Sequence, residues 1–256
     1  MEFVFTKVWK FFVFLCVYVK SRINLMKVAI IGYGKMGHEI EKVLLERGHE
    51  VVAKIDVDNR AEMMTPEVLS QADVAIEFTS PTTAYDNIKA CIEAGMAVLS
   101  GSTGWTERKA EIDELCRQKG GAFFYSSNYS VGVNILFRLN RWLAGVMGGM
   151  PQYGVGIEEV HHIHKLDAPS GTAATLAEEM KEASGGRVVV AREDIVSVRE
   201  GEVPGTHTIT YDSPEDTLTV SHCAKSRRGL AVGAVLAAEW LVGRKGVFTM
   251  DDFLKI

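Results

Sequence analysis

The feature that most constrains the fold is the stretch "KVAIIGYGKMGHEIEKVLLERGHEVVAKID" at residues 27–56. Residues 28–31 are wholly apolar, as expected of a short strand that is buried on both faces. Glycines in GxGxxG spacing follow at residues 32–37, and apolar side chains then recur at helical spacing. A second apolar strand at residues 51–55 ends at Asp56. This order of strand, glycine turn, helix and strand predicts a Rossmann-type unit that binds a dinucleotide.

Each part of this unit has a physical role. Gly32 permits the tight turn, Gly34 lets the backbone approach a pyrophosphate, and Gly37 allows the helix to pack closely on the strand. The free N–H groups at the helix start then face the phosphates, where the helix dipole favours negative charge. The predicted cofactor-binding residues of this turn are Gly32, Tyr33, Gly34, Lys35, Met36 and Gly37.

Asp56 bears on the choice of cofactor. A carboxylate at the end of the second strand can accept hydrogen bonds from the adenosine ribose hydroxyls, which favours NADH. Recognition of NADPH usually adds an arginine nearby, and the nearest one, Arg60, lies four positions on. We therefore expect NADH or NADPH as the cofactor, with NADH preferred.

The alternation of strand and helix continues to residue 127. Strands are expected within residues 72–81, 96–105 and 121–130, with helices between them at residues 84–95 and 107–120. This rhythm predicts a doubly wound parallel sheet, whose ligands bind beyond the carboxyl ends of the strands. The loops at those ends add the predicted cofactor-binding residues Gly101, Ser102, Thr103, Ser126, Ser127, Asn128 and Tyr129.

The pattern changes after Asn128. Helices are expected at residues 134–149, 170–186 and 230–246, with a strand at residues 155–163. Apolar and polar residues alternate as in half-buried antiparallel strands; the segments are residues 187–192, 195–212 and 215–226. We predict an α/β protein, with a Rossmann-type doubly wound parallel sheet plus a smaller α+β domain that has an open mixed sheet.

The predicted domain boundaries follow from this change. Residues 26–127 form the dinucleotide-binding domain, which a C-terminal helix at residues 228–256 completes. Residues 128–227 form a substrate-binding and oligomerisation domain. An open sheet with an apolar face needs cover, and a second subunit is the economical source, so we expect a homo-oligomer.

Residues 1–25 have no place in this pattern. Their apolar run "FFVFLCVYV" is shorter than the roughly 20 residues of a membrane span, and a poor cleavage site follows it. We expect an N-terminal extension outside the fold, with Met26 as the true start and no membrane role. The net charge of −5, with no Lys/Arg-rich run, argues against nucleic-acid binding. Four cysteines without a close pair indicate reduced thiols and a cytoplasmic protein.

The segment "HHIHKLDAPSGTA" at residues 161–173 concentrates polar chemistry. A metal site is disfavoured, because His161 and His164 point to opposite faces of a strand and no cysteine joins them. An anion site is favoured, because Ser170 is a good N-cap. Gly171 and Thr172 then present N–H groups at a helix start.

Lys165 and the histidines precede that turn. A cationic amine and titratable imidazoles beside a turn that binds a carboxylate suit an anionic substrate that takes up a proton. His164 has no expected role beyond a solvated rim.

The stretch "EEVHHIHKLDAPSGTA" closely resembles the long E-x-HH-x-x-K-x-DAPSGTA motif of dihydrodipicolinate reductases, and "GYGKMG", "EFTSP", "SGSTGW" and "SSNYSVGVN" agree with it. The likeness runs from Met26 to about Leu254. It implies reduction of 4-hydroxy-tetrahydrodipicolinate to tetrahydrodipicolinate with NAD(P)H in lysine and diaminopimelate biosynthesis, by a homotetramer. One loop differs from the usual sequence of the family, because residues 101–104 read Gly-Ser-Thr-Gly where Gly-Thr-Thr-Gly is more usual. This difference would affect cofactor preference more than the chemistry.

The resemblance also implies residue roles. His161 would be the acid/base residue and Lys165 the proton donor. His162, Gly171 and Thr172 would hold the carboxylates of a small-molecule dicarboxylate substrate. Two other functions stay open: a Rossmann oxidoreductase acting on an amino acid such as aspartate, and a non-enzymatic NAD(H) sensor.

Overall fold

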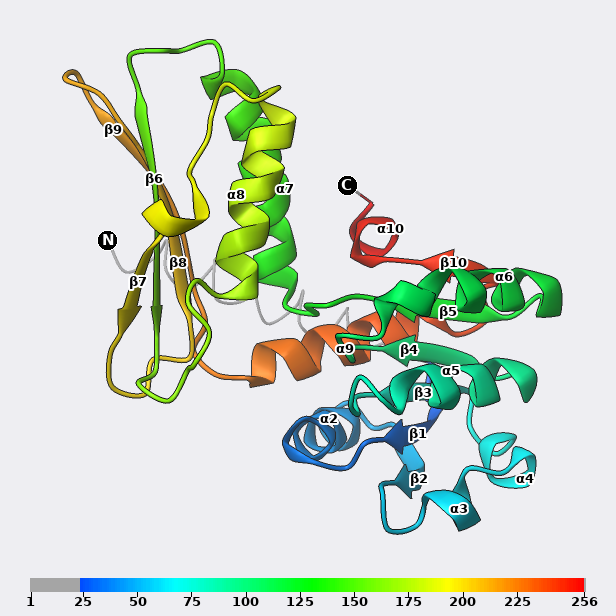
Figure 1. Cartoon of the computed structure of the whole chain (residues 1–256). Coiled ribbons are helices and arrows are strands. Elements are labelled where there is room, and N and C mark those ends of the chain that lie inside the picture. The colour runs from blue at the N-terminus through cyan, green and yellow to red at the C-terminus, as the bar shows by residue number, and fades with distance from the viewer. Residues whose placement is uncertain (1–23, 256) are drawn as a thin grey trace, which may run out of the picture.

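The computed structural model describes residues 24–255, so the predicted extension lies almost wholly outside the described residues. Two domains are visible side by side in Figure 1, one built on a parallel sheet and one on a smaller upright sheet. The chain passes between them twice, after β5 (Ala122–Tyr125) and before α9 (Arg228–Leu241). Within the described residues, no helix is both long enough and apolar enough to span a bilayer.

The first domain is the predicted Rossmann-type fold. Its sheet has six strands in the order β10-β5-β4-β3-β1-β2, and every pairing is parallel. From residue 27 to residue 125 its elements are β1 (Lys27–Ile31), α2 (Lys35–Glu46), β2 (Glu50–Ile55), α3 (Arg60–Met63), α4 (Pro66–Leu69), β3 (Val74–Glu77), α5 (Ala84–Glu93), β4 (Ala97–Ser100), η1 (Thr106–Arg108), α6 (Lys109–Lys119) and β5.

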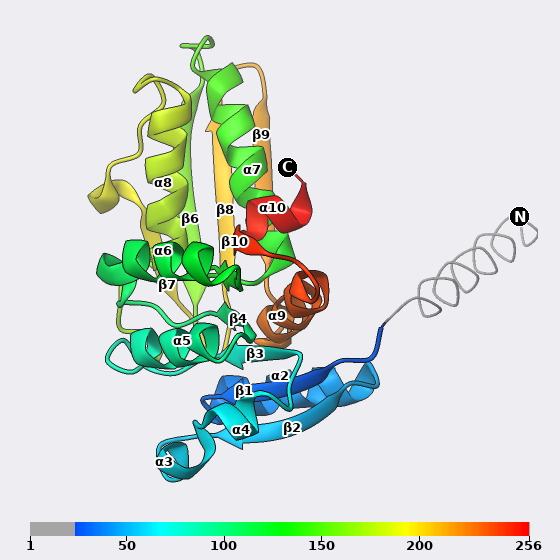
Figure 2. The ribbon, with the colours of Figure 1, turned by 90° about the vertical axis from the view of Figure 1, so that its right-hand side faces the viewer.

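Helices cover both faces of this sheet, as Figure 2 shows. Helices α2 and α9 pack on one face, and α5 and α6 pack on the other. Ile30 and Ile31 on β1 point to opposite faces and are both buried, which explains why this strand is wholly apolar. Cys91 and Cys116 are buried free thiols in the second of these layers.

The C-terminal region differs from the predicted single helix over residues 228–256. Helix α9 ends at Leu241, and the chain then forms β10 (Gly246–Phe248) and α10 (Met250–Leu254). Gly243 and Gly246 have positive φ angles of 79° and 128°, which interrupts helical backbone at low cost. The strand that follows pairs with β5 and adds the sixth strand of the sheet.

The second domain holds a mixed four-stranded sheet, as predicted. Its order is β7-β6-β8-β9; β6 pairs in parallel with β7 and antiparallel with β8, which pairs antiparallel with β9. The elements are α7 (Val131–Met147), β6 (Gly154–His161), α8 (Gly171–Ala183), η2 (Arg192–Asp194), β7 (Val196–Arg199), β8 (Thr206–Asp212) and β9 (Thr217–Cys223).

Three predictions for this domain were wrong in detail. Residues 187–192 are not a strand, because Val188 and Val190 pack into the domain core from an irregular segment. The segment at residues 195–212 forms two strands, β7 and β8, of which β7 pairs in parallel rather than antiparallel. Strand β6 ends at His161 and does not reach residue 163, since the chain turns there and the N–H of Lys165 bonds to the carbonyl of His162.

The apolar face of the second sheet is covered within the chain itself. Helices α7 and α8 lie on that face and bury Ile157, Ile209 and Tyr211 against it (Figure 1). The opposite face has no helix of residues 24–255 against it. Because side chains alternate along a strand, that face carries Thr208, Thr210 and Thr219 on β8 and β9 and the exposed Val196 on β7. The strongly apolar face of the sheet is thus covered within the chain, and the uncovered face is mixed in character.

Candidate active site

A cavity of about 490 Å³ lies where the two domains meet. Asn128 from the segment between the domains lines it together with His161 and Thr172 from the second domain. His207 on β8 and His222 on β9 complete its histidine-rich wall. A second hollow beside it is lined by Gly34, Lys35 and His38 from the glycine turn and by Ser226, Arg227 and Arg228 from the start of α9.

The glycine turn has the geometry expected of a pyrophosphate site. Gly32 has φ +94°, and a Cβ there would lie 2.0 Å from the carbonyl oxygen of Phe78. A Cβ on Gly37 would lie 2.4 Å from the carbonyl oxygen of Gly32, so helix and strand are as close as predicted. A Cβ on Gly34, in contrast, would meet nothing within 4 Å. Gly34 is also the N-cap of α2 and offers no side-chain cap, so the first N–H groups of the helix face open space.

Asp56 stands beside this turn at the end of β2. It is exposed, and its Oδ2 accepts a hydrogen bond from the backbone N–H of Tyr33 at 3.2 Å. Lys35 is exposed and Met36 is half-buried. Arg60 donates to Oδ1 of Asn87 at 2.9 Å and so is already engaged.

Glu77 connects the next two cofactor loops and is not among the residues predicted from the sequence. It is fully buried at the end of β3, and burial raises the pKa of its carboxyl. Oε1 accepts from the hydroxyl of Ser102 at 2.9 Å and from the backbone N–H of Thr79 at 3.1 Å. Oε2 accepts from the hydroxyl of Ser100 at 2.5 Å. The sequence did contain one indication of this role, because Glu77 is an acidic residue at the end of an otherwise apolar strand.

The remaining predicted cofactor residues divide between exposed and internal positions. Gly101 is half-buried and Thr103 is exposed, whereas Ser102 is buried and faces Glu77. Ser127 is exposed, Ser126 donates to the carbonyl of Asn128 at 2.7 Å, and Tyr129 is buried with its hydroxyl on the carbonyl of Ser100 at 2.8 Å. The side chains of Ser102 and Tyr129 therefore serve packing, and the carbonyl of Ser102 also accepts from Nε1 of Trp105 at 2.8 Å.

His161 ends β6 and lines the cavity. Its side chain is buried, and Nδ1 lies 3.1 Å from Oε2 of Glu159. Burial lowers the pKa of His161, while the charge of Glu159 opposes that shift. The half-buried His162 follows it. Lys165 lies in the next loop, where its Nζ is 2.7 Å from Asp167 and holds the pKa of that carboxyl below its usual range.

The N-cap predicted at Ser170 is present, at the start of the turn for which an anion-binding role is predicted. Ser170 is the N-cap of α8, and its hydroxyl accepts from the backbone N–H of Ala173 at 3.2 Å. Gly171 is exposed and Thr172 half-buried in the first turn, where free N–H groups and the helix dipole favour an anion.

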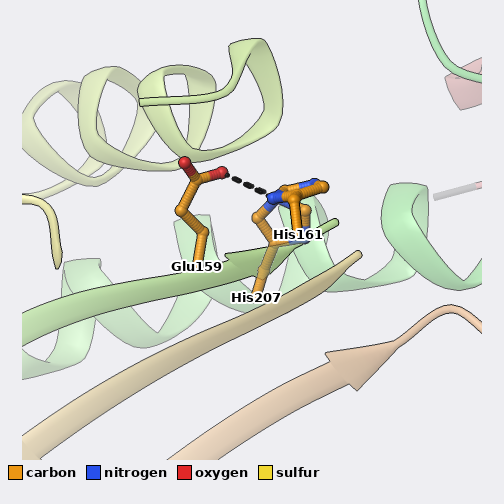
Figure 3. Close-up of side chains that lie close together, drawn as sticks. All are labelled: Glu159, His161 and His207. Carbon is orange, nitrogen blue, oxygen red and sulfur yellow. Dashed lines mark ion pairs between the residues drawn. The ribbon is translucent and has the colours of Figure 1, made fainter. Parts of the chain in front are cut away.

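Three residues of this site, Glu159, Arg199 and His207, are not among those predicted from the sequence. Glu159 and His207 lie together with the predicted His161 in Figure 3, and atoms of these three side chains that could bind a metal lie within 4.8 Å of one another. Arg199 donates to Oε1 of Glu159 at 3.0 Å. His207 and Arg199 lie on strands far along the chain, and spacing alone could not bring them here. Glu159, two residues before His161 on the same strand face, could have been found.

The metal site considered from the sequence paired His161 with His164, whereas the structure brings His161 together with Glu159 and His207. His164 is exposed and pairs with Glu202 at 3.2 Å, away from the buried His161. Strand alternation does not set the direction of His164, because β6 has already ended at His161. The distances among Glu159, His161 and His207 would admit a cation. The charge of Glu159 is, however, already compensated by the guanidinium of Arg199.

A parallel dinucleotide-type sheet, a glycine turn with an open approach and a histidine-lined cavity between two domains define a two-domain oxidoreductase that uses NAD(P)H. Comparison with known proteins specifies the kind. Family models for "Dihydrodipicolinate reductase, N-terminus" and "Dihydrodipicolinate reductase, C-terminus" match residues 26–129 and 132–254. The chain belongs to the dihydrodipicolinate reductase family.

Curated relatives agree with this assignment, and a solved structure agrees with the fold. A 4-hydroxy-tetrahydrodipicolinate reductase from Christiangramia forsetii is 45% identical over 236 residues, covering 90% of this chain and 98% of that protein. One from Acinetobacter baumannii is 31% identical over 265 residues, covering 89% and 96%. The structure of dipicolinate-bound dihydrodipicolinate reductase from Paenisporosarcina sp. TG-14 has a TM-score of 0.73 at 21% identity, covering 90% of this chain and 99% of that one, which supports the fold.

Proposed function

We propose that this chain reduces 4-hydroxy-tetrahydrodipicolinate to tetrahydrodipicolinate with NADH or NADPH, in lysine and diaminopimelate biosynthesis. The observation that carries the proposal is the cavity between the domains, where His161 and Thr172 face the segment that follows the dinucleotide fold. A site that joins an anion-binding turn, an imidazole and a cofactor cleft suits the reduction of an anionic ring that takes up a proton.

The dinucleotide fits the residues present. Gly34 leaves room for a pyrophosphate, and the N-terminus of α2 offers N–H groups to it. Loops 101–103 and 126–129 would hold the rest of the molecule, which supplies a hydride when bound. Gly171 and Thr172 would bind a substrate carboxylate, with His162 beside them, so that C4 of the ring faces the cofactor. Lys165, or His161, would deliver the proton that the reduced ring takes up.

NADH is the preferred cofactor in this proposal. Asp56 is exposed at the end of β2 and would repel a 2′-phosphate while accepting hydrogen bonds from a free ribose hydroxyl. Arg60, the arginine considered for NADPH, is turned toward Asn87. The reduced thiols of Cys91 and Cys116 and the need for a reduced nucleotide support a cytoplasmic site of action.

Substitution of Lys165 tests the proposed function. We expect Lys165→Ala to lower turnover by roughly 10²- to 10⁴-fold, the usual contribution of a general acid. NADH affinity should stay near that of the unmodified chain, because Lys165 lies in the second domain. The measurement is NADH or NADPH oxidation coupled to a synthase that supplies the substrate, with NADH binding followed by fluorescence.

Lys181→Ala is the matched control, because Lys181 is an exposed lysine in the last turn of α8. Its turnover should be unchanged. Near-normal turnover of Lys165→Ala would remove Lys165 from the mechanism. Absence of oxidation by the unmodified chain with either cofactor would overturn the function, and activity with aspartate instead would favour an amino-acid dehydrogenase.

A further inference from the structure

We infer that Glu159 is a positioning residue for the proposed reaction. Its buried carboxylate contacts the imidazole of His161 with one oxygen and the start of α8 with the other. It thereby fixes the group that handles the proton relative to the turn that binds the substrate. This inference rests on the proposed function, because it assigns Glu159 an effect that is exerted through His161.

The two oxygens of Glu159 face different parts of the site. The side chain is fully buried on β6. Oε1 accepts from the backbone N–H of Ser170 at 3.1 Å and from Nη2 of Arg199 at 3.0 Å. Oε2 lies 3.1 Å from Nδ1 of His161, as the dashed line in Figure 3 shows. One rigid group therefore spans the N-cap of α8 and the end of β6.

This contact bears on which ring nitrogen of His161 carries a proton. Nδ1 of His161 and Oε2 of Glu159 are buried 3.1 Å apart, and neither atom makes a hydrogen bond within residues 24–255, so the contact is a close approach of a ring nitrogen to a carboxylate. A carboxylate can only accept and favours a proton on the nitrogen that faces it, so we place the proton of the neutral ring on Nδ1. Nε2 is then left for the cavity, where it lies beside Gly205, on which a Cβ would come within 3.0 Å of it.

The carboxylate remains charged despite its burial. Burial alone would raise the pKa of Glu159, but hydrogen bonds from Ser170 and Arg199 oppose it, and that pKa is held below its usual range. Arg199 also donates to the carbonyl of Asp167 at 2.6 Å and to that of Lys165 at 3.3 Å. The Glu159–Arg199 pair therefore also anchors the loop that carries the proposed proton donor.

The charge of Glu159 acts on the titration of His161 in one direction. Removing it lowers the pKa of His161 further, because burial already disfavours the imidazolium ion. Other titratable or charged groups face this ring or share its cavity: Lys165 and Asp167 in the following loop, Arg199 on β7, His207 on β8, His222 on β9, and Lys225, Arg227 and Arg228 before and at the start of α9. None of these groups is altered by substitutions at Glu159.

The test is Glu159→Gln, which keeps the shape and the acceptor for Ser170 but places an amide N–H₂ toward Nδ1. We expect the proton to move to Nε2, which the ring ¹⁵N shifts of His161 report. Turnover should fall about tenfold or more, a share of the usual effect of a general acid or base. The KM for the substrate should change far less, and the pH limb assigned to His161 should move to lower pH.

Matched variants separate positioning from a loss of structure. Glu158→Gln alters the neighbouring, exposed carboxylate on the same strand and should leave turnover, tautomer and pH profile unchanged. Glu159→Ala also removes the acceptor for Ser170, so its KM should rise together with the fall in turnover. Both Glu159 variants should bind NADH as the unmodified chain does.

Two outcomes would overturn the inference and leave the function intact. One is a Glu159→Gln protein with unchanged tautomer and pH profile while His161→Ala loses turnover. The other is tightly bound zinc whose removal by a chelator abolishes activity, since Glu159 would then serve a metal. If His161→Ala itself keeps full turnover, the proposed catalytic role fails first. The ¹⁵N measurement on Glu159→Gln still decides whether the carboxylate sets the tautomer.

Discussion

His207 shows how burial adjusts a single side chain in this site. Burial, followed by the neighbouring His161, lowers the pKa of His207 from 6.5 to about 4. Its ring packs edge-on to that of His161 at 5.2 Å, and Nε2 lies 3.1 Å from the hydroxyl of Ser170. A neutral His207 adds no positive charge beside the proton-handling ring, so it does not add to the lowering of the pKa of His161 by the charges of Lys165 and Arg199.

This shift predicts how stability depends on pH. The folded pKa of His207 is depressed, so acidification protonates the unfolded chain first. The contribution of neutral His207 to the free energy of unfolding is complete above pH 6.5. It is lost as the pH falls toward 4, and the loss is at most roughly 3 kcal/mol. Urea unfolding at pH 6.5 and 4.5 should show a smaller loss of unfolding free energy for His207→Gln than for the unmodified chain. The lower bound of pH 4.5 limits interference from carboxylates.

His164→Gln is the control for these unfolding measurements, because His164 is exposed on the loop that follows β6. Its pH dependence of unfolding should match that of the unmodified chain. His161 and His222 also have lowered pKa values, so the His207→Gln variant should keep part of the dependence. Equal slopes for His207→Gln and the unmodified chain would show that His207 ionises normally in the fold.

At the scale of elements, the strand–turn–helix unit separates packing from ligand binding. Gly37 and Gly34 are three residues apart, yet only Gly37 is in close contact with the backbone. We expect Gly37→Ala to destabilise the fold by roughly 1–3 kcal/mol, because β1 and α2 must move apart. Gly34→Ala should cost less than about 1 kcal/mol, since its φ of −83° suits alanine and only the N-cap preference is lost.

The affinity for the cofactor should be affected more by Gly34→Ala than by Gly37→Ala, which is the reverse of the order expected for stability. The methyl group of Gly34→Ala occupies the space proposed for the pyrophosphate, so the Kd for NADH should rise about tenfold or more, equivalent to roughly 1.4 kcal/mol. Thermal unfolding and NADH titration of both variants check the pair. Unchanged NADH binding by Gly34→Ala would place the pyrophosphate elsewhere.

At the scale of the whole molecule, the outer face of the second sheet is the surface to explain. Its Thr and Ser side chains lie on β8 and β9, beside the exposed Val196 on β7, and no helix among residues 24–255 covers it. Small β-branched polar side chains suit packing against a second sheet. We propose that this face joins copies of the chain in a homo-oligomer, a homotetramer as the family resemblance implies.

Adding charge to that face tests the assembly. Thr219→Arg places a guanidinium on the exposed side of β9, so like charges would meet across a symmetric interface. We expect a smaller species by light scattering, with the circular dichroism of the protomer retained. Gln118→Arg adds the same charge on exposed α6 of the other domain and should leave the mass unchanged. An unchanged mass for Thr219→Arg would move the interface elsewhere.

The sequence by itself determined the elements whose contacts lie between residues that are close together in the chain. An apolar strand, a GxGxxG turn and a helix led directly to β1, α2 and the pyrophosphate-type geometry, because Gly32 and Gly37 report contacts only a few residues away. Ser170 likewise identified the start of α8, since a cap bonds three residues on. The long motif around residue 161 indicated the family that the comparisons confirm.

Only the tertiary structure decided what depends on distant segments. Strand β10 exists because β5 offers an unpaired edge, and its few residues carry too little periodicity to predict it. The parallel pairing of β7 was also set by the fold around it. Arg199 and His207 reach Glu159 across β7 and β8, and no spacing in the chain encodes those contacts. The environment that sets charge and tautomer at His161 is therefore a property of the assembled sheet, because burial and Coulomb interactions depend on distance in space and not along the chain.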